Sequence, residues 1–394
     1  MKIKSLYYIT HIDNLPSILE RGILSRVKIE TERTRFISIF KRKTDAKDNI
    51  NKRQKVRLPD GRKNLLNYTS LFFQPRNPMM YRAIFETGID QLAILELADA
   101  VLNEPEVIIA DGNTSDELTQ FNPAAQGLQK LQQQQKTMQS EWWKECDGSK
   151  RRIMAECLVP DRVSPKYIHS IVVADSGIKN WVQKIVEGSQ LPVICQPDMF
   201  FQPKRRIEIG KNISLIDGGD IFFSELQTLT VTVNLQGVMG KGLALRAREQ
   251  FPDVYVEYEK ACRAKKITSE RPYIYKRETS VVDELADLKP YCRRIENPMK
   301  WFLLFATKRH WRANSRIEDI ESGLKWLEKN FKEKGIQSLA MSALGCALGG
   351  LDWIDVAPLM CKHLHDIGIP VEIYLPREYP IEPQHLTGSH LLSL

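Results

Sequence analysis

The chain has 394 residues, which is enough for two domains that each bury a core of their own. Its 57 Lys and Arg outweigh 49 Asp and Glu, and the net charge of +8 favours an anionic partner. No apolar run approaches membrane-spanning length, the first residues lack a signal-peptide core, and no long segment combines low hydrophobicity with high charge. We therefore expect a globular cytoplasmic protein, a monomer, with no membrane partner.

Cysteine usage indicates a reducing compartment. The seven cysteines are an odd number without any CxxC pair, so we expect free thiols and neither a disulfide framework nor a metal site. The cysteines are Cys146, Cys157, Cys195, Cys262, Cys292, Cys346 and Cys361.

Residues 7–24 predict a strand followed by a helix. Asp13 or Asn14 is suited to the N-cap of this helix, Pro16 to its first turn and Gly22 to its C-cap. The N-terminal half of the chain otherwise predicts short strands and irregular loops, with few long helices.

A strongly basic segment spans residues 41–63. It holds ten Lys or Arg against three Asp, a local net charge of +7, and the aromatic-rich residues 66–81 follow it. Basic groups that bind phosphates, next to aromatic rings that stack on bases, are typical of single-strand binding sites. The alternative is a solvated basic face of a helix, which the local pattern alone slightly favours.

Residues 151–160 predict an interior strand that contains a glutamate. Alternation places apolar side chains on both faces, and Glu156 interrupts one of them. Glutamate is rarely buried without a partner, and such residues cluster at functional sites. Two hypotheses stay open on this pattern: a catalytic carboxylate, or a structural ion pair with Arg151, Arg152 or another basic residue.

These N-terminal segments resemble the DarT toxins, which transfer ADP-ribose from NAD to a base of single-stranded DNA. The matching segments span nearly the whole domain and are residues 7–24, 66–81, 110–112 and 155–160. The resemblance implies an α+β ADP-ribosyltransferase fold, in which a split pair of small β-sheets surrounds an NAD cleft. It also implies NAD as a co-substrate and single-stranded DNA as a partner.

The same resemblance implies roles for individual residues. A glutamate matching Glu156 is catalytic, and an arginine that we align with Arg53 assists it. Residues matching His11, Asn14 and Arg76 lie at the NAD pocket. A fixed carboxylate stabilises the cation-like transition state as nicotinamide leaves, and it can accept the proton that the acceptor base loses.

The domain boundary is expected within residues 195–206. Pro197 and Pro203 punctuate this segment, and a basic triplet closes it. We therefore predict one domain at residues 1–203 and a second at residues 204–394.

Residues 231–252 predict a buried strand, a glycine-rich turn and the start of a helix. Backbone N–H groups of such a loop, together with the helix N-terminus behind it, favour phosphate. The spacing matches neither the dinucleotide fingerprint nor the P-loop, because Lys241 is not followed by Ser or Thr. Taken alone, the loop is a tight turn at least as often as a ligand site.

Two further strand ends strengthen the prediction of a ligand site. Residues 301–306 form an apolar run that changes abruptly to the polar residues 307–310. Residues 338–360 contain an apolar strand, three glycines and Asp352, which is suited to cap the next helix. Ligands of open α/β sheets bind beyond the carboxyl ends of the strands. We therefore expect a phosphate-bearing nucleotide ligand.

Residues 220–376 resemble a macrodomain, the ADP-ribose-binding fold, and more narrowly the DarG antitoxin branch. The matching segments have the same order and intervals and are residues 219–224, 233–245, 305–324 and 344–353. The resemblance implies a three-layer α/β/α domain. It further implies that Lys308 is required for removing ADP-ribose from a modified DNA base and that Asp220 contacts adenine.

Two glycine loops are implied to hold the diphosphate and distal ribose of ADP-ribose. We expect Cys346 to be a packing residue, because no partner base is evident. The family usually has Gly and Asn where this chain has Ala347 and Leu348, and a Cβ at a ligand-facing turn restricts the approach of the ribose. The residues implied to bind ADP-ribose are Asp220, Asn234, Gly237, Gly240, Lys241, Gly242, Gly345, Cys346, Gly349 and Gly350.

Together the resemblances predict a toxin–antitoxin fusion that writes ADP-ribose on single-stranded DNA, with thymine as the preferred base, and removes it hydrolytically. DarG proteins usually carry a further inhibitory domain, which we do not expect here.

Two alternatives stay open. The macrodomain binds ADP-ribose without cleaving it, which the substitutions at Ala347 and Leu348 favour and Lys308 opposes. Or the transferase is weak and acts mainly in DNA binding. DarT proteins often have His where this chain has Asn113, which permits the second alternative because Asn cannot carry a proton near neutral pH.

Overall fold

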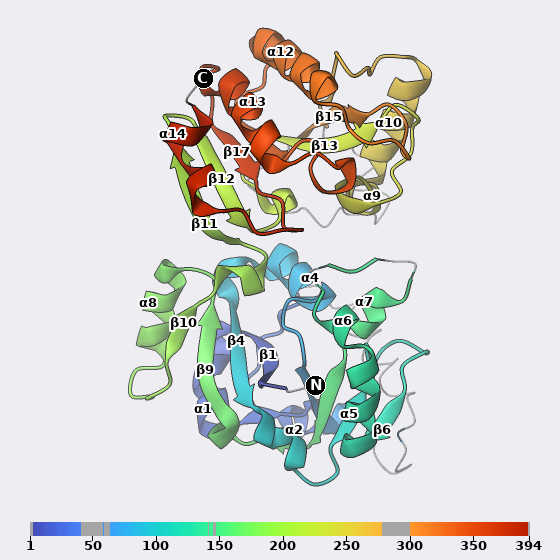
Figure 1. Cartoon of the computed structure of the whole chain (residues 1–394). Helices are drawn as coiled ribbons and strands as arrows, with labels where there is room; N and C mark the ends of the chain where they lie inside the picture. Colours follow the sequence, from blue (N-terminus) through green and yellow to red (C-terminus); the bar gives the residue numbers. More distant parts are fainter. Residues whose placement is uncertain are drawn as a thin grey trace. The chain divides into compact units, whose positions relative to one another are not determined.

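The computed structural model divides into two compact units, residues 1–200 and 201–394, which are described separately (Figure 1). The division falls just before the predicted boundary, because β11 begins at Pro203 and pairs with a strand of the second unit. The described residues are 3–40, 58, 64–140, 142–144, 147–277 and 300–392. The basic segment with Arg53 therefore lies, except for Leu58, outside the described residues.

The first unit is built on a sheet of eight strands in the order β10-β9-β4-β1-β3-β7-β5-β6. The ladder between β1 and β3 has a single pair, Tyr7 with Phe72, whereas β1 and β4 pair over seven positions from Ser5 to His11. The sheet is thus two four-stranded halves joined at one point, which agrees with the predicted split. The strands are β1 (Ser5–His11), β3 (Tyr68–Phe72), β4 (Leu92–Ala98), β5 (Ile108–Ala110), β6 (Phe121–Pro123), β7 (Glu156–Pro160), β9 (Ile168–Val173) and β10 (Val193–Cys195).

Short helices surround this sheet, as the sequence predicts. Asn14 occupies the N-cap position of α1, and Gly22 ends that helix at φ 91°, where a Cβ would lie 2.3 Å from the carbonyl oxygen of Val163. The helices are α1 (Leu15–Arg21), α2 (Arg26–Thr31), α4 (Pro78–Thr87), α5 (Ala124–Gln133), α6 (Gln135–Met138), α7 (Ser149–Arg152) and α8 (Ser176–Ile185), and β2 (Ile23–Leu24) pairs with β8 (Arg162–Val163).

The strand predicted at residues 151–160 is shorter than expected. Arg151 and Arg152 belong to α7, and the strand begins only at Glu156. The backbone carbonyl of Arg151 accepts hydrogen bonds from the N–H groups of Asn113 and Met154, which holds this segment in a turn. The part that is a strand, β7, is buried on both faces as predicted.

The second unit has a sheet of seven strands in the order β11-β12-β17-β16-β13-β15-β14. The five inner strands are parallel, and β11 and β14 pair antiparallel at the edges. The parallel strands are almost entirely buried, which explains the continuous apolar run that predicted β15. The strands are β11 (Pro203–Ile209), β12 (Ile213–Gly218), β13 (Thr228–Asn234), β14 (Tyr273–Tyr275), β15 (Trp301–Lys308), β16 (Leu339–Ser342) and β17 (Val371–Tyr374).

Helices cover both faces of this sheet. One apolar core joins the sheet to α12, α13 and α14, and a second core joins it to α9 and α10. This is the three-layer α/β/α arrangement that the sequence predicts (Figure 1). No described helix of either unit is long and apolar enough to cross a membrane. The helices are α9 (Gly242–Gln250), α10 (Pro252–Arg263), α12 (Ile317–Lys334), α13 (Trp353–His365) and α14 (Gly388–Leu391).

Candidate active sites

Glu156 lies in the interior of one half-sheet of the first unit. It is the first residue of β7 and pairs with Phe72 of β3 on one side and Ala110 of β5 on the other. The residue is only 4% exposed, and its Oε1 accepts a hydrogen bond from the backbone N–H of Thr114 at 2.9 Å. Strand register therefore fixes the backbone of Glu156, and a loop fixes its carboxylate.

The loop that binds Glu156 spans residues 111–120. Hydrogen bonds within the loop and an ion pair to α7 hold it in shape. Asp111 forms an ion pair with Arg151 at 2.6 Å, with both side chains mostly buried. The Asn113 side chain accepts a hydrogen bond from the N–H of Ser115 at 3.0 Å, so it shapes the turn. Arg151 of α7 thus pairs with Asp111 of this loop.

His11 lies at the end of β1 and is 7% exposed. Its Nδ1 accepts a hydrogen bond from the backbone N–H of Asp13 at 3.2 Å. Because Nδ1 is the acceptor, the neutral ring carries its proton on Nε2.

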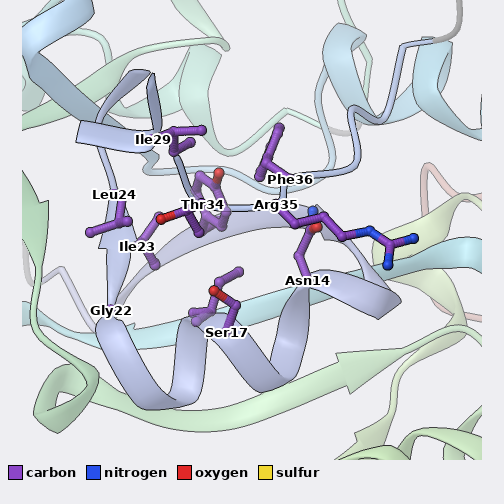
Figure 2. Close-up of a pocket in the computed structure, with 11 residues that line it drawn as sticks. Asn14, Ser17, Gly22, Ile23, Leu24, Ile29, Thr34, Arg35 and Phe36 are labelled. Atoms are coloured by element: carbon purple, nitrogen blue, oxygen red, sulfur yellow. The ribbon is translucent and has the colours of Figure 1, made fainter. Parts of the chain in front are cut away.

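Asn14 is engaged on both sides of its amide. Its Nδ2 donates to the carbonyl of Ile37 at 2.8 Å, and its Oδ1 accepts from the N–H of Ile37 at 2.9 Å. This pair of bonds ties residues 34–37 to the start of α1. Residues 34–36 of this segment form one wall of a small pocket, and Ser17 of α1 lies on the opposite wall (Figure 2).

Arg76 follows β3 and is 8% exposed. Its Nη1 donates to the carbonyl of Asp198 at 3.3 Å, and the next residue, Asn77, caps α4 through the N–H groups of Met79 and Met80. The described contacts thus place the predicted NAD residues on neighbouring elements, but only Asn14 lines the pocket in Figure 2.

In the second unit, Asn234 holds the first glycine loop in shape. Its Nδ2 donates to the carbonyl of Val238 at 2.6 Å, and its Oδ1 accepts from the N–H of Gln236 at 2.9 Å. Gly237 and Gly242 have φ values of 76° and 57°, the left-handed region that suits glycine. The amide of Asn234 is therefore a support of the loop.

The second glycine loop follows β16 and packs against Ser315. The N–H of Ser315 donates to the carbonyl of Gly349 at 2.8 Å, and a Cβ on Gly349 would lie 2.5 Å from Ser315 Oγ. Cys346 is buried, and burial raises the pKa of its thiol to about 12, which suits the predicted packing role. Asp352 occupies the N-cap position of α13, but its side chain makes no capping bond to this described helix.

Lys308 joins the two glycine loops. It is the last residue of β15, and its Nζ donates to the carbonyl of Leu348 in the second loop. The Leu348 side chain reaches the first loop, since its Cδ1 lies 3.0 Å from the position of a Cβ on Gly242. Burial, and then the charge of Lys241, lower the pKa of Lys308 below its ordinary value.

Asp220 lies beyond the end of β12 and is 4% exposed. Its Oδ1 accepts a hydrogen bond from the N–H of Phe222 at 3.1 Å, and its Oδ2 forms an ion pair with Arg246 of α9. The sequence reasoning missed Arg246 and Ser315, because neither belongs to a glycine motif and each comes next to the site only through folding.

Comparisons with known proteins agree with this division of the chain. The family described as "ssDNA thymidine ADP-ribosyltransferase, DarT" matches residues 7–201, and "Macro domain" matches residues 231–360. A DNA ADP-ribosyl transferase–DNA ADP-ribosyl glycohydrolase fusion protein of Thermosipho africanus is 45% identical over 393 residues, which cover 99% of each chain. The chain belongs to this fusion family.

Two further relatives describe the family. The solved structure of Thermosipho africanus DarTG in complex with ADP-ribose matches with a TM-score of 0.74 at 43% identity, covering 99% of this chain and 100% of that one. A DNA ADP-ribosyl glycohydrolase of Thermus aquaticus is 34% identical over 163 residues, 41% of each chain. The predicted DarT domain and macrodomain are thereby confirmed.

Proposed function

We propose that the first unit transfers ADP-ribose from NAD to a thymine base of single-stranded DNA, and that the second unit removes it by hydrolysis. The observation that carries this proposal is that each unit of a DarT–macrodomain chain holds a reactive group that its neighbours fix in position. These groups are Glu156, fixed by the Thr114 amide, and Lys308, held between two glycine loops.

For the transfer, the bond between nicotinamide and C1 of its ribose breaks while the base nitrogen forms a new bond to the same carbon. Glu156 stabilises the positive charge that develops on the ribose, and it takes the proton that the base nitrogen releases. The arrangement suits this role, because the backbone amide of Thr114 holds Oε1 in place. Nicotinamide leaves as the neutral base.

NAD as the co-substrate rests on residues around β1 and β3. We assign His11, through its Nε2–H, to a ribose hydroxyl, and Arg76 and Arg53 to the diphosphate or the deprotonated base. Asn14 acts by holding residues 34–37 in place, as its two bonds to Ile37 support.

For the removal, ADP-ribose lies along the carboxyl ends of the parallel strands. We assign adenine to Asp220, which closes one end of the site, and the diphosphate and distal ribose to the two glycine loops. The amine of Lys308 then bonds to the ribose carbon while the bond from that carbon to the base nitrogen breaks, and the proton that the amine loses goes to the base nitrogen. Water then replaces the lysine nitrogen on the same carbon, which releases free ADP-ribose and restores the amine. The lowered pKa of Lys308 supports this role, because it enlarges the neutral, nucleophilic fraction.

A second candidate for the macrodomain is binding without cleavage. Ala347 has a φ of 56°, a region costly for any residue with a Cβ, and the Leu348 carbonyl engages the Lys308 amine. Both features favour a site that holds ADP-ribose more readily than it turns it over.

The test incubates the full chain and two variants with NAD and a thymine-containing single-stranded oligonucleotide and follows its mass. Lys308→Ala should accumulate an oligonucleotide heavier by one ADP-ribosyl group, and Glu156→Gln should leave it unmodified. The purified adduct, given to Glu156→Gln, should return to its starting mass. Tight binding without return would select the second candidate, and no adduct from Lys308→Ala would overturn the transferase assignment.

A further inference from the structure

An exposed aromatic and cationic turn follows Lys308 directly. Trp311 is 47% exposed, although tryptophan is usually well buried. The His310 ring stacks on it with centroids 5.6 Å apart at 24°, and the Arg312 guanidinium lies over the indole ring at 4.4 Å. We call residues 310–312 the Trp311 platform.

The platform is anchored on both sides and is tied to both glycine loops. Arg309 forms two hydrogen bonds to Asp319 of α12, at 2.9 and 2.8 Å. Gln236 of the first loop donates to the Arg309 carbonyl at 3.4 Å, and Ser315 donates to the carbonyl of Gly349 in the second loop. A turn bond from the N–H of Ala313 to the carbonyl of His310, at 3.0 Å, closes the platform itself. The exposed ring is therefore held in place.

The order of the strands places the platform away from the adenine end of the site. Asp220 follows β12 and Trp311 follows β15, and four strand spacings separate these strands. At about 4.8 Å per spacing the two ends are roughly 19 Å apart. Trp311 is three residues from Lys308, so their Cα atoms are within about 11 Å. The platform thus lies at the Lys308 end of the site, opposite the end that holds Asp220.

The chemistry of the platform fits one occupant. An indole ring flanked by a guanidinium stacks on any nucleobase, and the guanidinium reaches a phosphate. Among the described residues no carboxylate forms an ion pair with Arg312, whereas Arg309 and Arg316 pair with Asp319 and Glu318. We propose that the Trp311 platform binds the DNA strand that carries the adduct, with the base next to the modified one stacked on Trp311 and its phosphate on Arg312. This inference rests on the proposed function of the macrodomain.

The experiment compares two substrates in the full chain carrying Glu156→Gln, so that nothing is rewritten. One is an ADP-ribosylated trinucleotide and the other is the ADP-ribosylated nucleoside, which has no neighbouring base. Trp311→Ala should raise the KM for the trinucleotide roughly tenfold, because stacking on one base is lost, and the KM for the nucleoside should stay the same. Trp311→Phe should restore most of the loss, and the Kd for ADP-ribose should not move. Arg312→Gln should reduce the salt dependence of trinucleotide cleavage.

Trp181→Ala is the matched control, since this tryptophan is 42% exposed on α8 of the other unit. It should change the KM for neither substrate. If Trp311→Ala raises the KM equally for the trinucleotide and the nucleoside, or for neither, the proposed role of the platform is wrong. The proposed function of the macrodomain would remain intact. Cleavage of neither substrate by the parent chain, with ADP-ribose still bound, would instead overturn the proposed glycohydrolase and the platform with it.

Discussion

The two units position their reactive groups by different means. In the second unit, Lys308 and both glycine loops follow neighbouring parallel strands, β13, β15 and β16, so they meet at one edge of the sheet. In the first unit, Glu156 lies within a mainly antiparallel sheet, and the loop that binds it comes from a segment about 40 residues earlier in the chain.

This difference between the two sheets explains why one group of residues is easier to place from the sequence than the other. The carboxyl ends of parallel strands lie at one edge of a sheet, so glycines and a lysine that follow three apolar runs are expected to lie close together. In an antiparallel sheet, the register between strands decides which residues lie side by side. No local sequence pattern predicts that register. Substitutions in the two units should therefore affect transfer and removal of ADP-ribose separately.

Glu156→Gln should have the largest effect. The glutamine keeps an oxygen for the Thr114 amide but loses the charge, so transfer should fall by about 10²-fold or more while the melting temperature stays nearly unchanged. Oligonucleotide mass and thermal melting measure the two quantities. Glu96→Gln, on strand β4 of the same sheet, is the matched control and should keep activity. Wholesale unfolding with Glu156→Gln would show that this carboxylate is mainly structural.

Lys308→Ala should separate the two units inside a cell. With removal lost and transfer intact, ADP-ribose should accumulate on chromosomal DNA and growth should stop, whereas Lys308→Ala with Glu156→Gln should be harmless. Tethering places eraser near writer at an effective concentration of roughly millimolar order, so the parent chain should be tolerated. Lys325→Ala, an exposed lysine of α12, is the control. A well-expressed, adduct-free and harmless Lys308→Ala chain would contradict the pairing of the two activities.

The pH dependence of adduct removal should show how Lys308 acts. Since burial and the Lys241 charge lower its pKa, the rate should rise with pH and level off below pH 10.5 if the neutral amine attacks. Lys241→Met removes a nearby positive charge, which raises the pKa of Lys308 and should move the profile to higher pH at saturating substrate. A rate that falls as pH rises would mean that the ammonium form is the active one.

The smallest effects should come from the substituted loop. Leu348→Asn removes the side chain that reaches Gly242, and we expect a gain in kcat of about fivefold, or ~1 kcal/mol. Ala347→Gly removes about 1–2 kcal/mol of left-handed strain but adds about 0.5–1 kcal/mol of chain entropy. The free energy of unfolding of Ala347→Gly should therefore rise by about 0–1.5 kcal/mol in urea titrations. A loss of turnover in either variant would show that this loop is already adapted to cleavage.

Much of the fold could be predicted from local sequence pattern, and the prediction failed where contacts distant in sequence decide the structure. The apolar runs of β13, β15 and β16 and the glycine after α1 were recognisable because burial and left-handed backbone restrict residue choice strongly. The strand at residues 151–160 was predicted too long, because its first half is held in a turn by bonds to a loop far away in sequence.

The supports of the two sites were out of reach for the same reason. Nothing near Thr114 indicates that its backbone N–H binds Glu156, and nothing near Asn14 indicates that its amide binds Ile37. Arg246 is one of two basic residues on α9, and only the fold selects it as the partner of Asp220. The sequence shows which residue types are present, whereas the hydrogen-bond and ion-pair partners of these residues depend on the tertiary structure.

The single ladder pair between β1 and β3 determines how the first unit yields to local opening. Separating the two half-sheets breaks the ladder only at Tyr7 and Phe72, whereas separating strands within a half breaks several pairs at once. Amide protons should therefore exchange with solvent in two cooperative groups, one for each half-sheet, with the seam between them exchanging first. The sheet should therefore open most readily between β1 and β3 and resist opening within each half.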